Sequence, residues 1–324
     1  MKLMNGLLDR FGRIHTYLRI SLTERCNMQC SYCIPEDGLP GKPPNALPSA
    51  AEILQMAEVF IRLGITKIRL TGGEPLLYPQ LPEILKGLSG RVEDLAISTN
   101  GILLDRHWEH FHQSGLRHIN ISLDSLDAAA FRSMTKSGQF DRIMENLREA
   151  LRQGFQVKVN AVLIRGENEQ QAASLASLTL KSKMSVRFIE FMPFHRNGWQ
   201  APKVQSTADT LSVLKQHFEL EKIPDKASDT DRKYRIPGAA GDIDFISTIT
   251  EPFCTGCNRL RLTADGKLKN CLFARNETNL LQALRAGENL EELIRKNLQE
   301  KYERTGGQQM SEATENRSMI RIGG

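Results

Sequence analysis

The stretch SLTERCNMQCSYCIPEDG (21–38) joins the end of an apolar run to three cysteines with the spacing C-x3-C-x2-C. The cysteines are Cys26, Cys30 and Cys33. Zinc sites and most iron–sulfur sites use four protein ligands, so a compact set of three leaves one position of a metal centre open. Catalytic metal sites keep such a position for a substrate or cofactor. The stretch therefore predicts a metal centre that binds a ligand from outside the chain.

The apolar run before these cysteines is the first of six, each with the length of a strand. The runs are TYLRISL (16–22), KIRLTG (67–72), DLAIST (94–99), HINISL (118–123), QVKVNAVLI (156–164) and VRFIEF (186–191). Between them, apolar side chains recur at helical three- and four-residue steps in 48–64, 128–135, 139–154 and 167–182. Repeated βα units imply a parallel sheet with right-handed crossovers. We therefore predict an α/β fold in which residues 1–193 form an incomplete (βα)6 barrel of the TIM type.

The regular alternation ends after residue 193. Residues 194–250 are polar and interrupted by proline and glycine, and a second cysteine set follows them. We predict that residues 194–324 form a C-terminal region that closes the barrel as a lid and carries a second metal centre.

The second set consists of Cys254, Cys257 and Cys271, and there is no cysteine between residues 34 and 253. Disulfides are typical of small secreted domains, so metal ligation is the better interpretation here. A structural zinc ion would need a fourth ligand, but no Cys or His follows Cys271, and the last histidine is His217. The ligand count favours a three-cysteine iron–sulfur cluster, with zinc as the alternative.

The composition narrows the class of ligand. A net charge of +5 and a pI near 8.9 fit a small anionic substrate. Aromatic residues make up only 6% of the chain, which disfavours a nucleic-acid surface. No apolar stretch reaches the roughly 18 residues of a membrane span, and the first residues lack the apolar run of a signal peptide. We expect a cytoplasmic protein that binds neither membrane nor nucleic acid.

Polar groups follow the ends of the predicted strands, where βα barrels build their active sites. In TGGEP (71–75), two glycines allow a ligand to approach the backbone closely. Other strand ends carry STNG (98–101), SLDS (122–125) and EFMP (190–193). Together these segments predict a polar rim around the first cysteine set.

Cationic side chains are the second group of candidate site residues, because they could bind an anionic substrate. Arg259 and Arg261 in CNRLRLTADG (257–266) would project to the same side of an extended segment and clamp phosphate oxygens. Arg69 lies in an otherwise apolar run, where a charge is unusual, and Lys158 lies in the fifth run. We expect both to face the arginine pair.

These motifs resemble a known family. The cysteine spacing, with Tyr32 before the last cysteine, resembles the radical S-adenosylmethionine (SAM) superfamily. Within it, the chain is similar to the GTP 3′,8-cyclase family of molybdenum cofactor biosynthesis over nearly its whole length. The segments that carry this likeness are DRFGRIHTYLRISLTERCN (9–27), PFCTGCNRLRLTADGKLKNCLF (252–273) and the terminal RIGG (321–324). The loop PEDGLPGKPPNALPS (35–49) departs from the family pattern and leaves the entrance geometry open.

The resemblance implies two [4Fe-4S] clusters, one on each cysteine set, with SAM on the open iron of the first. It implies SAM contacts from Tyr32, Gly73, Ser122 and Met192. It implies GTP contacts from Arg19, Arg69, Thr99, Lys158, Arg259, Leu260 and Arg261, and it assigns no protein acid or base. The guanine of GTP would meet the second cluster, and Gly323 and Gly324 would reach toward the active site.

The implied reaction begins when a 5′-deoxyadenosyl radical removes the 3′ hydrogen of GTP. The C3′ radical then attacks C8, which gives 3′,8-cyclo-7,8-dihydro-GTP in the first step of molybdenum cofactor biosynthesis. Implied partners are a low-potential flavodoxin- or ferredoxin-like electron donor and a downstream cyclic pyranopterin monophosphate synthase, and a homodimer stays open. The alternatives are a radical SAM peptide-modifying enzyme with an auxiliary cluster and a zinc-stabilised binding protein.

Overall fold

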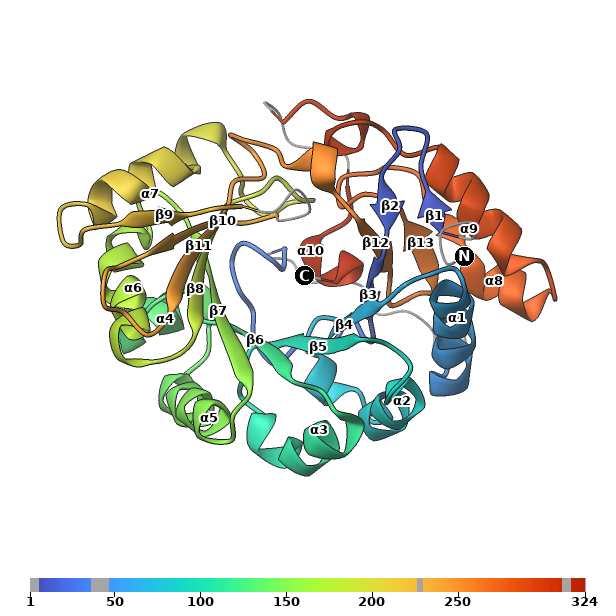
Figure 1. The fold of residues 1–324 in the computed structure, drawn as a ribbon, viewed down its shortest axis with the longest axis horizontal. Coiled ribbons are helices and arrows are strands. Elements are labelled where there is room, and N and C mark those ends of the chain that lie inside the picture. Colours follow the sequence, from blue (N-terminus) through green and yellow to red (C-terminus); the bar gives the residue numbers. More distant parts are fainter. Residues whose placement is uncertain (1–5, 36–46, 226–229, 311–315, 324) are drawn as a thin grey trace.

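The computed structural model describes residues 6–35, 47–225, 230–310 and 316–323. The chain forms one twelve-stranded sheet that curves into an open ring, with most helices on its outside (Figure 1). The strand order is β14-β13-β12-β3-β4-β5-β6-β7-β8-β11-β10-β9. Residues 36–46 of the proline-rich loop and Gly324 lie outside the described residues.

Six consecutive parallel strands match the six predicted runs. They are β3 (Tyr17–Ser21), β4 (Lys67–Thr71), β5 (Asp94–Thr99), β6 (His118–Ser122), β7 (Gln156–Leu163) and β8 (Ser185–Glu190). The predicted α/β class is confirmed by these strands and the helices between them.

The predicted helices correspond to α1 (Ala50–Arg62), α4 (Ala128–Thr135), α5 (Phe140–Arg152) and α6 (Ala172–Lys181). The first begins at Ser49, whose hydroxyl accepts from the Glu52 backbone in a capping box. Between the six core strands, α2 (Leu81–Leu88) and α3 (Trp108–Ser114) were not among the predicted helices. Neither has a side chain that caps its first turn, so the usual start pattern is missing from the sequence.

Residues after 193 extend the sheet at both edges. On one side β11 (Asp242–Ile246) pairs in parallel with β8, and β10 (Arg232–Arg235) and β9 (Glu221–Ile223) follow it. On the other side β12 (Arg259–Leu262) pairs in parallel with β3, and β13 (Lys267–Lys269) and β14 (Thr278–Asn279) follow. The C-terminal region therefore supplies strands that flank the six-strand core, and the sequence had not predicted this.

The remaining elements lie at both ends of the sheet and inside the ring. A hairpin of β1 (Leu7–Leu8) and β2 (Ile14–His15) packs near α8 (Leu280–Arg285) and α9 (Leu290–Gln299), whereas α7 (Thr207–Leu214) lies at the other end of the sheet (Figure 1). The short α10 (Met319–Ile322) lies inside the ring, together with the C-terminal end of the chain. In the described parts of the chain, no helix combines the length and apolarity that crossing a membrane requires.

The two faces of the sheet differ in chemistry. Side chains that point outward toward the helices are apolar and fully buried, such as Leu18, Ile20 and Ile68. Their neighbours in the pleat, such as Arg19 and Arg69, line the interior of the ring. The sheet therefore encloses a polar cavity.

Candidate functional site

The first cysteine set sits in a loop at the carboxyl end of β3. The loop is wound by bonds from the Cys33 and Ile34 backbone N–H groups to the Cys30 carbonyl, at 3.0 and 3.1 Å. It is tied to the end of α4 by a bond from the Ser31 N–H to the Met134 carbonyl at 3.0 Å. All three thiols are free of disulfides, so they are available as ligands.

The TGGEP segment lies directly against this loop. The Gly73 N–H donates to the Thr23 carbonyl at 2.6 Å, and the Glu74 N–H donates to the Arg25 carbonyl at 2.8 Å. A Cβ on Gly73 would lie 2.4 Å from the Arg25 carbonyl oxygen, so only glycine fits. The glycine thus supports the geometry of the cysteine loop, whatever else contacts it.

Glu74 connects this segment to the end of β5. Its carboxylate accepts from the Leu76 N–H at 3.0 Å, the Thr99 hydroxyl at 2.8 Å and the Asn100 N–H at 2.7 Å. Burial nevertheless raises the pKa of Glu74 to about 7. The Thr99 hydroxyl is therefore engaged with Glu74, and Thr99 does not line the cation-lined cavity described below.

The other predicted SAM contacts lie on the same rim. The Tyr32 hydroxyl donates to buried Asp124 at 2.7 Å, and burial raises the pKa of Asp124 to about 6. The Asn197 amide donates to the carbonyls of Tyr32 at 3.1 Å and Met192 at 2.9 Å. Ser122 ends β6 beside these groups. The structure therefore brings Tyr32, Gly73, Ser122 and Met192 to the carboxyl-end rim. Asp124 lies in the predicted rim segment SLDS, where it had not been named, and Asn197 lies outside the predicted rim segments.

The thiols of the first set fit a cluster in their chemistry. Burial raises the pKa of Cys26 to about 11 and that of Cys33 to about 12, and it raises the pKa of Cys30 well above its usual value. Burial therefore favours the protonated thiols, and binding of an iron–sulfur cluster would release their protons. The Asn100 amide lies 4.0 Å from the Cys26 sulfur, where it can donate to a ligating thiolate.

The cysteines of the second set lie on either side of the β12–β13 pair in the sequence. Cys254 and Cys257 precede β12, and Cys271 follows β13. Burial alone would raise the pKa of Cys257, but the nearby charges of Lys301 and Arg259 outweigh it and lower that pKa. Among the described residues, no three His, Cys, Asp or Glu side chains converge closely enough to hold a single metal ion. Thiolates that ligate different irons of one cubane do not need to converge on one point.

A cation-lined cavity of about 1210 Å³ opens at the amino ends of the strands. In the sheet register, Arg259 lies beside Tyr17 and Tyr17 beside Lys67; one pleat further along, Arg261 lies beside Arg19 and Arg19 beside Arg69. The Arg69 Nε donates to the Tyr17 hydroxyl at 2.6 Å. Burial would raise the pKa of Tyr17, but Arg69, Arg19, Arg259 and Lys67 together lower it to about 7. Such a field favours a multiply charged anion.

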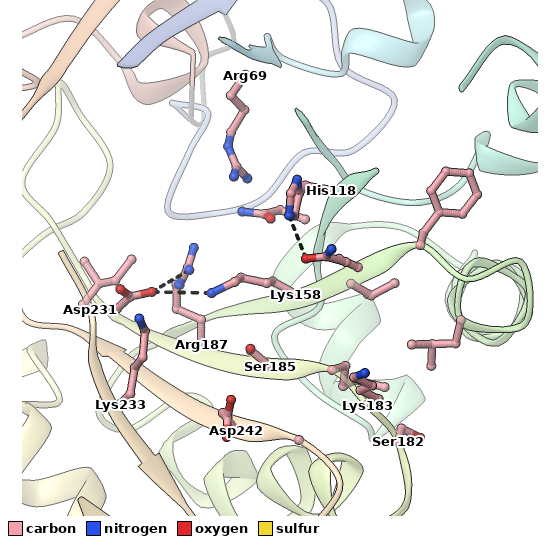
Figure 2. Close-up of a pocket in the computed structure, with 18 of the residues that line it drawn as sticks. Arg69, His118, Lys158, Ser182, Lys183, Ser185, Arg187, Asp231, Lys233 and Asp242 are labelled. Carbon is pink, nitrogen blue, oxygen red and sulfur yellow. Dashed lines mark hydrogen bonds and ion pairs between the residues drawn. The ribbon is translucent and has the colours of Figure 1, made fainter. Parts of the chain in front are cut away.

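Two carboxylates balance further cations on the opposite wall of this cavity. Figure 2 shows Lys158 and Arg187 pointing toward Asp231. The Arg187–Asp231 and Lys158–Asp244 distances are 2.6 and 2.9 Å. An incoming anion would therefore compete with these carboxylates for both cations.

Only some of the residues predicted to contact GTP line this cavity. Arg19, Arg69, Lys158 and Arg259 line the cavity. Leu260 points to the opposite face and is fully buried in the core, so only its backbone could contact a ligand. Lys67 and Arg187 also line the cavity and were missed. The signal was the two-residue strand period, since Lys67 shares a face with Arg69.

The C-terminal tail packs against β12, β4 and the first cysteine loop. The Arg261 guanidinium donates to the Gly323 carbonyl at 2.7 Å. Arg321 lies 3.5 Å from Glu24, and the backbone of Ile320 hydrogen-bonds to Cys33. A Cβ on Gly323 would lie 2.6 Å from the Thr71 hydroxyl, so the tail is packed tightly against β4. It therefore lies between the cysteine loop and β12.

Comparisons with known proteins agree with this arrangement. Residues 20–179 match the radical SAM superfamily, and residues 184–306 match the family described as Molybdenum Cofactor Synthesis C. The solved structure of Streptococcus suis SuiB has a TM-score of 0.63 over 90% of this chain and 69% of its own, at 15% identity. At that identity the likeness shows the fold alone.

Relatives of known name are much closer in sequence. The human molybdenum cofactor biosynthesis protein 1 is 46% identical over 89% of this chain, which spans only 46% of that protein's length. The mitochondrial GTP 3′,8-cyclase of Arabidopsis thaliana is 42% identical over 98% of this chain and 83% of its own. The GTP 3′,8-cyclase of Peptoclostridium acidaminophilum is 39% identical over 89% of this chain and 90% of its own length. The chain therefore belongs to the radical SAM superfamily and, within it, to the GTP 3′,8-cyclase family of molybdenum cofactor biosynthesis.

Proposed function

We propose that the protein is a GTP 3′,8-cyclase that converts GTP to 3′,8-cyclo-7,8-dihydro-GTP with SAM and two [4Fe-4S] clusters. The observation that carries this proposal is a division of the ring interior. A rim of thiols and glycine-rich loops occupies the carboxyl ends of the strands, and a cavity lined by Arg19, Lys67, Arg69, Lys158 and Arg259 opens at their amino ends. A molecule with a triphosphate at one end and a reactive sugar and base at the other suits this division.

Each part of the chain has a proposed task. Residues 1–193 would be the incomplete (βα)6 barrel, and 194–324 the region that carries the second cluster and the substrate arginines. Cys26, Cys30 and Cys33 would hold the first cluster, and Cys254, Cys257 and Cys271 the second. Tyr32, Gly73, Ser122 and Met192 would contact SAM. Arg19, Arg69, Lys158, Arg259, Arg261 and the backbone of Leu260 would contact GTP, together with Lys67 and Arg187. Thr99 would act through Glu74.

When held by Cys26, Cys30 and Cys33, the reduced first cluster would supply, together with SAM, the radical chemistry needed to remove the 3′ hydrogen of GTP. The contribution of the chain is to bind, orient and exclude water. The cations hold the triphosphate, which fixes the distance between the ribose and the rim. The tail at Gly323 and Arg261 closes the space between the rim and β12, and a closed cavity protects a carbon radical from solvent.

The test is anaerobic incubation of the reconstituted protein with SAM and a strong reductant, with GTP, with ATP or without nucleotide. We expect GTP alone to stimulate 5′-deoxyadenosine formation, and deuterium placed at C3′ of GTP to appear in that product. Equal 5′-deoxyadenosine with and without GTP would leave a radical SAM enzyme with another substrate. No 5′-deoxyadenosine from protein that carries its clusters would overturn the proposal.

The wider setting is also proposed. A flavodoxin- or ferredoxin-like donor would reduce the clusters, and a cyclic pyranopterin monophosphate synthase would take the product. A cytoplasmic location and a homodimer stay predictions, which cell fractionation and analytical ultracentrifugation would check.

A further inference from the structure

Lys301 is a buried lysine between two segments of the second cysteine set. It follows the end of α9, and only 2% of its surface is exposed. Its ammonium lies 3.2 Å from the Arg259 carbonyl, 2.5 Å from the Asn270 carbonyl and 4.0 Å from the Cys257 sulfur. A lysine ammonium has three N–H donors, and these three acceptors use all of them.

The two carbonyls belong to the segments that present the cysteines. Arg259 lies two residues after Cys257, and Asn270 directly precedes Cys271. One side chain from a third segment therefore joins both, and it fixes the separation of the two cysteines. Asn270 is held further by its side-chain amide, which donates to the Asn297 carbonyl at 2.7 Å.

Among the described residues, no carboxylate lies within ion-pair distance of the Lys301 ammonium. A second buried lysine nearby, Lys269, differs in this respect, because its ammonium lies 3.4 Å from Glu277. Burying an ammonium without an adjacent anion is unfavourable. The arrangement around Lys301 therefore implies that an anionic group occupies the space beside Cys257. A cluster with thiolate ligands is such a group, and it is the one that the proposed function assigns there.

We propose that Lys301 is a positioning residue of the second cluster, which holds the Cys257 and Cys271 segments together and raises the reduction potential of the cluster. The inference rests on the second cluster of the proposed function. Reduction adds one electron to the cluster, forms and breaks no bond, and leaves the lysine proton in place. A fixed positive charge favours the state with one more negative charge, and hydrogen bonds to ligand sulfurs tune cluster potentials.

The test is a reductive titration of the full chain with both clusters, followed by electron paramagnetic resonance. Lys301→Met removes the charge at similar length, Lys301→Arg keeps it, and Lys296→Met makes the same change at an exposed position of α9. The first cluster serves as an internal reference, identified by the change of its signal when SAM is added.

We expect Lys301→Met to make reduction of the second cluster at least tenfold less favourable. For one electron, this corresponds to a reduction potential lower by about 59 mV. Lys301→Arg and Lys296→Met should leave it near the wild-type value, and the first cluster should not move in any variant. If Lys301→Met loses half of the bound iron, retention of both clusters by Lys301→Arg would support the charge-dependent positioning role.

Three results would overturn the inference. The first is an unchanged potential in Lys301→Met with the second cluster bound. The second is an equal shift, or equal loss of the second cluster, in the Met and Arg variants. The third is wild-type protein that binds iron for one cluster only, which would also remove the second cluster from the proposed function. Because GTP turnover is not the readout, failure at Lys301 is distinguishable from failure of the cyclase activity.

Discussion

Single residues in the cavity are tuned by the charges around them. Tyr17 shows this most directly, because four cations act on its phenol from three neighbouring strands. Below its lowered pKa the phenol is neutral and leaves the cations to the ligand. Above it, the phenolate is itself an anion in the binding site.

We expect the affinity for GTP to fall as the pH rises through about 7, because the Tyr17 phenolate competes with phosphate for the cations. The affinity of Tyr17→Phe should vary less with pH. The pH dependence of the stability has the opposite sign. The folded phenol loses its proton near 7 and the unfolded one near 10, so the free energy of unfolding should rise with pH between these values. Urea unfolding and GTP binding, each measured from pH 6 to 10, check both. Parallel pH profiles of wild type and Tyr17→Phe would contradict this prediction.

Arg13 joins the amino-terminal hairpin to the second cysteine set. Its guanidinium lies 2.6 Å from Asp9 and donates to the carbonyls of Cys254, Tyr302 and Glu303. Both side chains of the Arg13–Asp9 pair are almost fully buried. The pair therefore anchors the segment that begins at Cys254.

Replacing Arg13 by Met should cost about 3–5 kcal/mol of unfolding free energy, because it leaves the Asp9 carboxylate buried without its guanidinium partner. It should also lower the iron bound by the second set while the first set keeps its own. Urea unfolding and iron analysis measure these effects, with exposed Arg10→Met as the matched control. Equal unfolding midpoints for the two variants would show that Arg13 does not act as described.

At the scale of elements, the strands were predictable where the pattern was apolar and local. All six runs of the core became strands, and Ser49 and Glu52 indicated the start of α1. The strand β11, which connects β10 and β9 to the core, was not predicted, because its sequence DIDFI lies in a polar stretch rich in glycine and proline. Its pairing with β8 and β10, a tertiary arrangement, makes it a strand.

The residues of the candidate site were likewise predictable where local motifs indicated them. The cysteines and the rim followed from motifs, and Arg69 followed from its apolar surroundings. Arg187 also lies among apolar neighbours, in VRFIEF, but it was not predicted, because its role depends on Asp231 far along the chain. The bond between Thr99 and Glu74 likewise joins the end of β5 to the segment after β4, so spacing within one segment could not reveal it.

The tail element gives a test of its own. Gly323→Ala should reduce GTP-dependent 5′-deoxyadenosine formation by about tenfold or more, an effect of roughly 1.4 kcal/mol, because its Cβ would strike the Thr71 hydroxyl. Gly238→Ala is the matched control, since Gly238 also has a positive φ but has open space around its Cβ. Product chromatography under the same anaerobic conditions compares the two. The tail would have no such role if both variants kept equal activity.

At the scale of the whole molecule, the two regions share one sheet. Without residues 194–324, β3 would lose its neighbour β12 and β8 would lose β11, which exposes two strand edges. The six-strand core is therefore not expected to be stable alone.

A fragment of residues 1–193 should be insoluble or melt without cooperativity, and co-expression of 194–324 as a separate chain should recover soluble protein. Circular dichroism and calorimetry measure this, with the full chain as the reference. A soluble fragment with a sharp thermal transition would establish 1–193 as an independent domain.

The pairing of β12 with β3 also orders the events of synthesis. The contact between Asn258 and Thr16 spans 242 positions, and at about 5–20 residues per second the ribosome needs roughly 10 to 50 s to make that length. During this interval the nascent chain holds the first cysteine loop on an unfinished sheet. Factors that deliver iron and sulfur therefore meet the two loops at different times, and the surroundings of the second become complete only after Lys301 has been made. A chain stalled before Lys301 would keep the first ligand set and lack the lysine and the hairpin contacts that support the second.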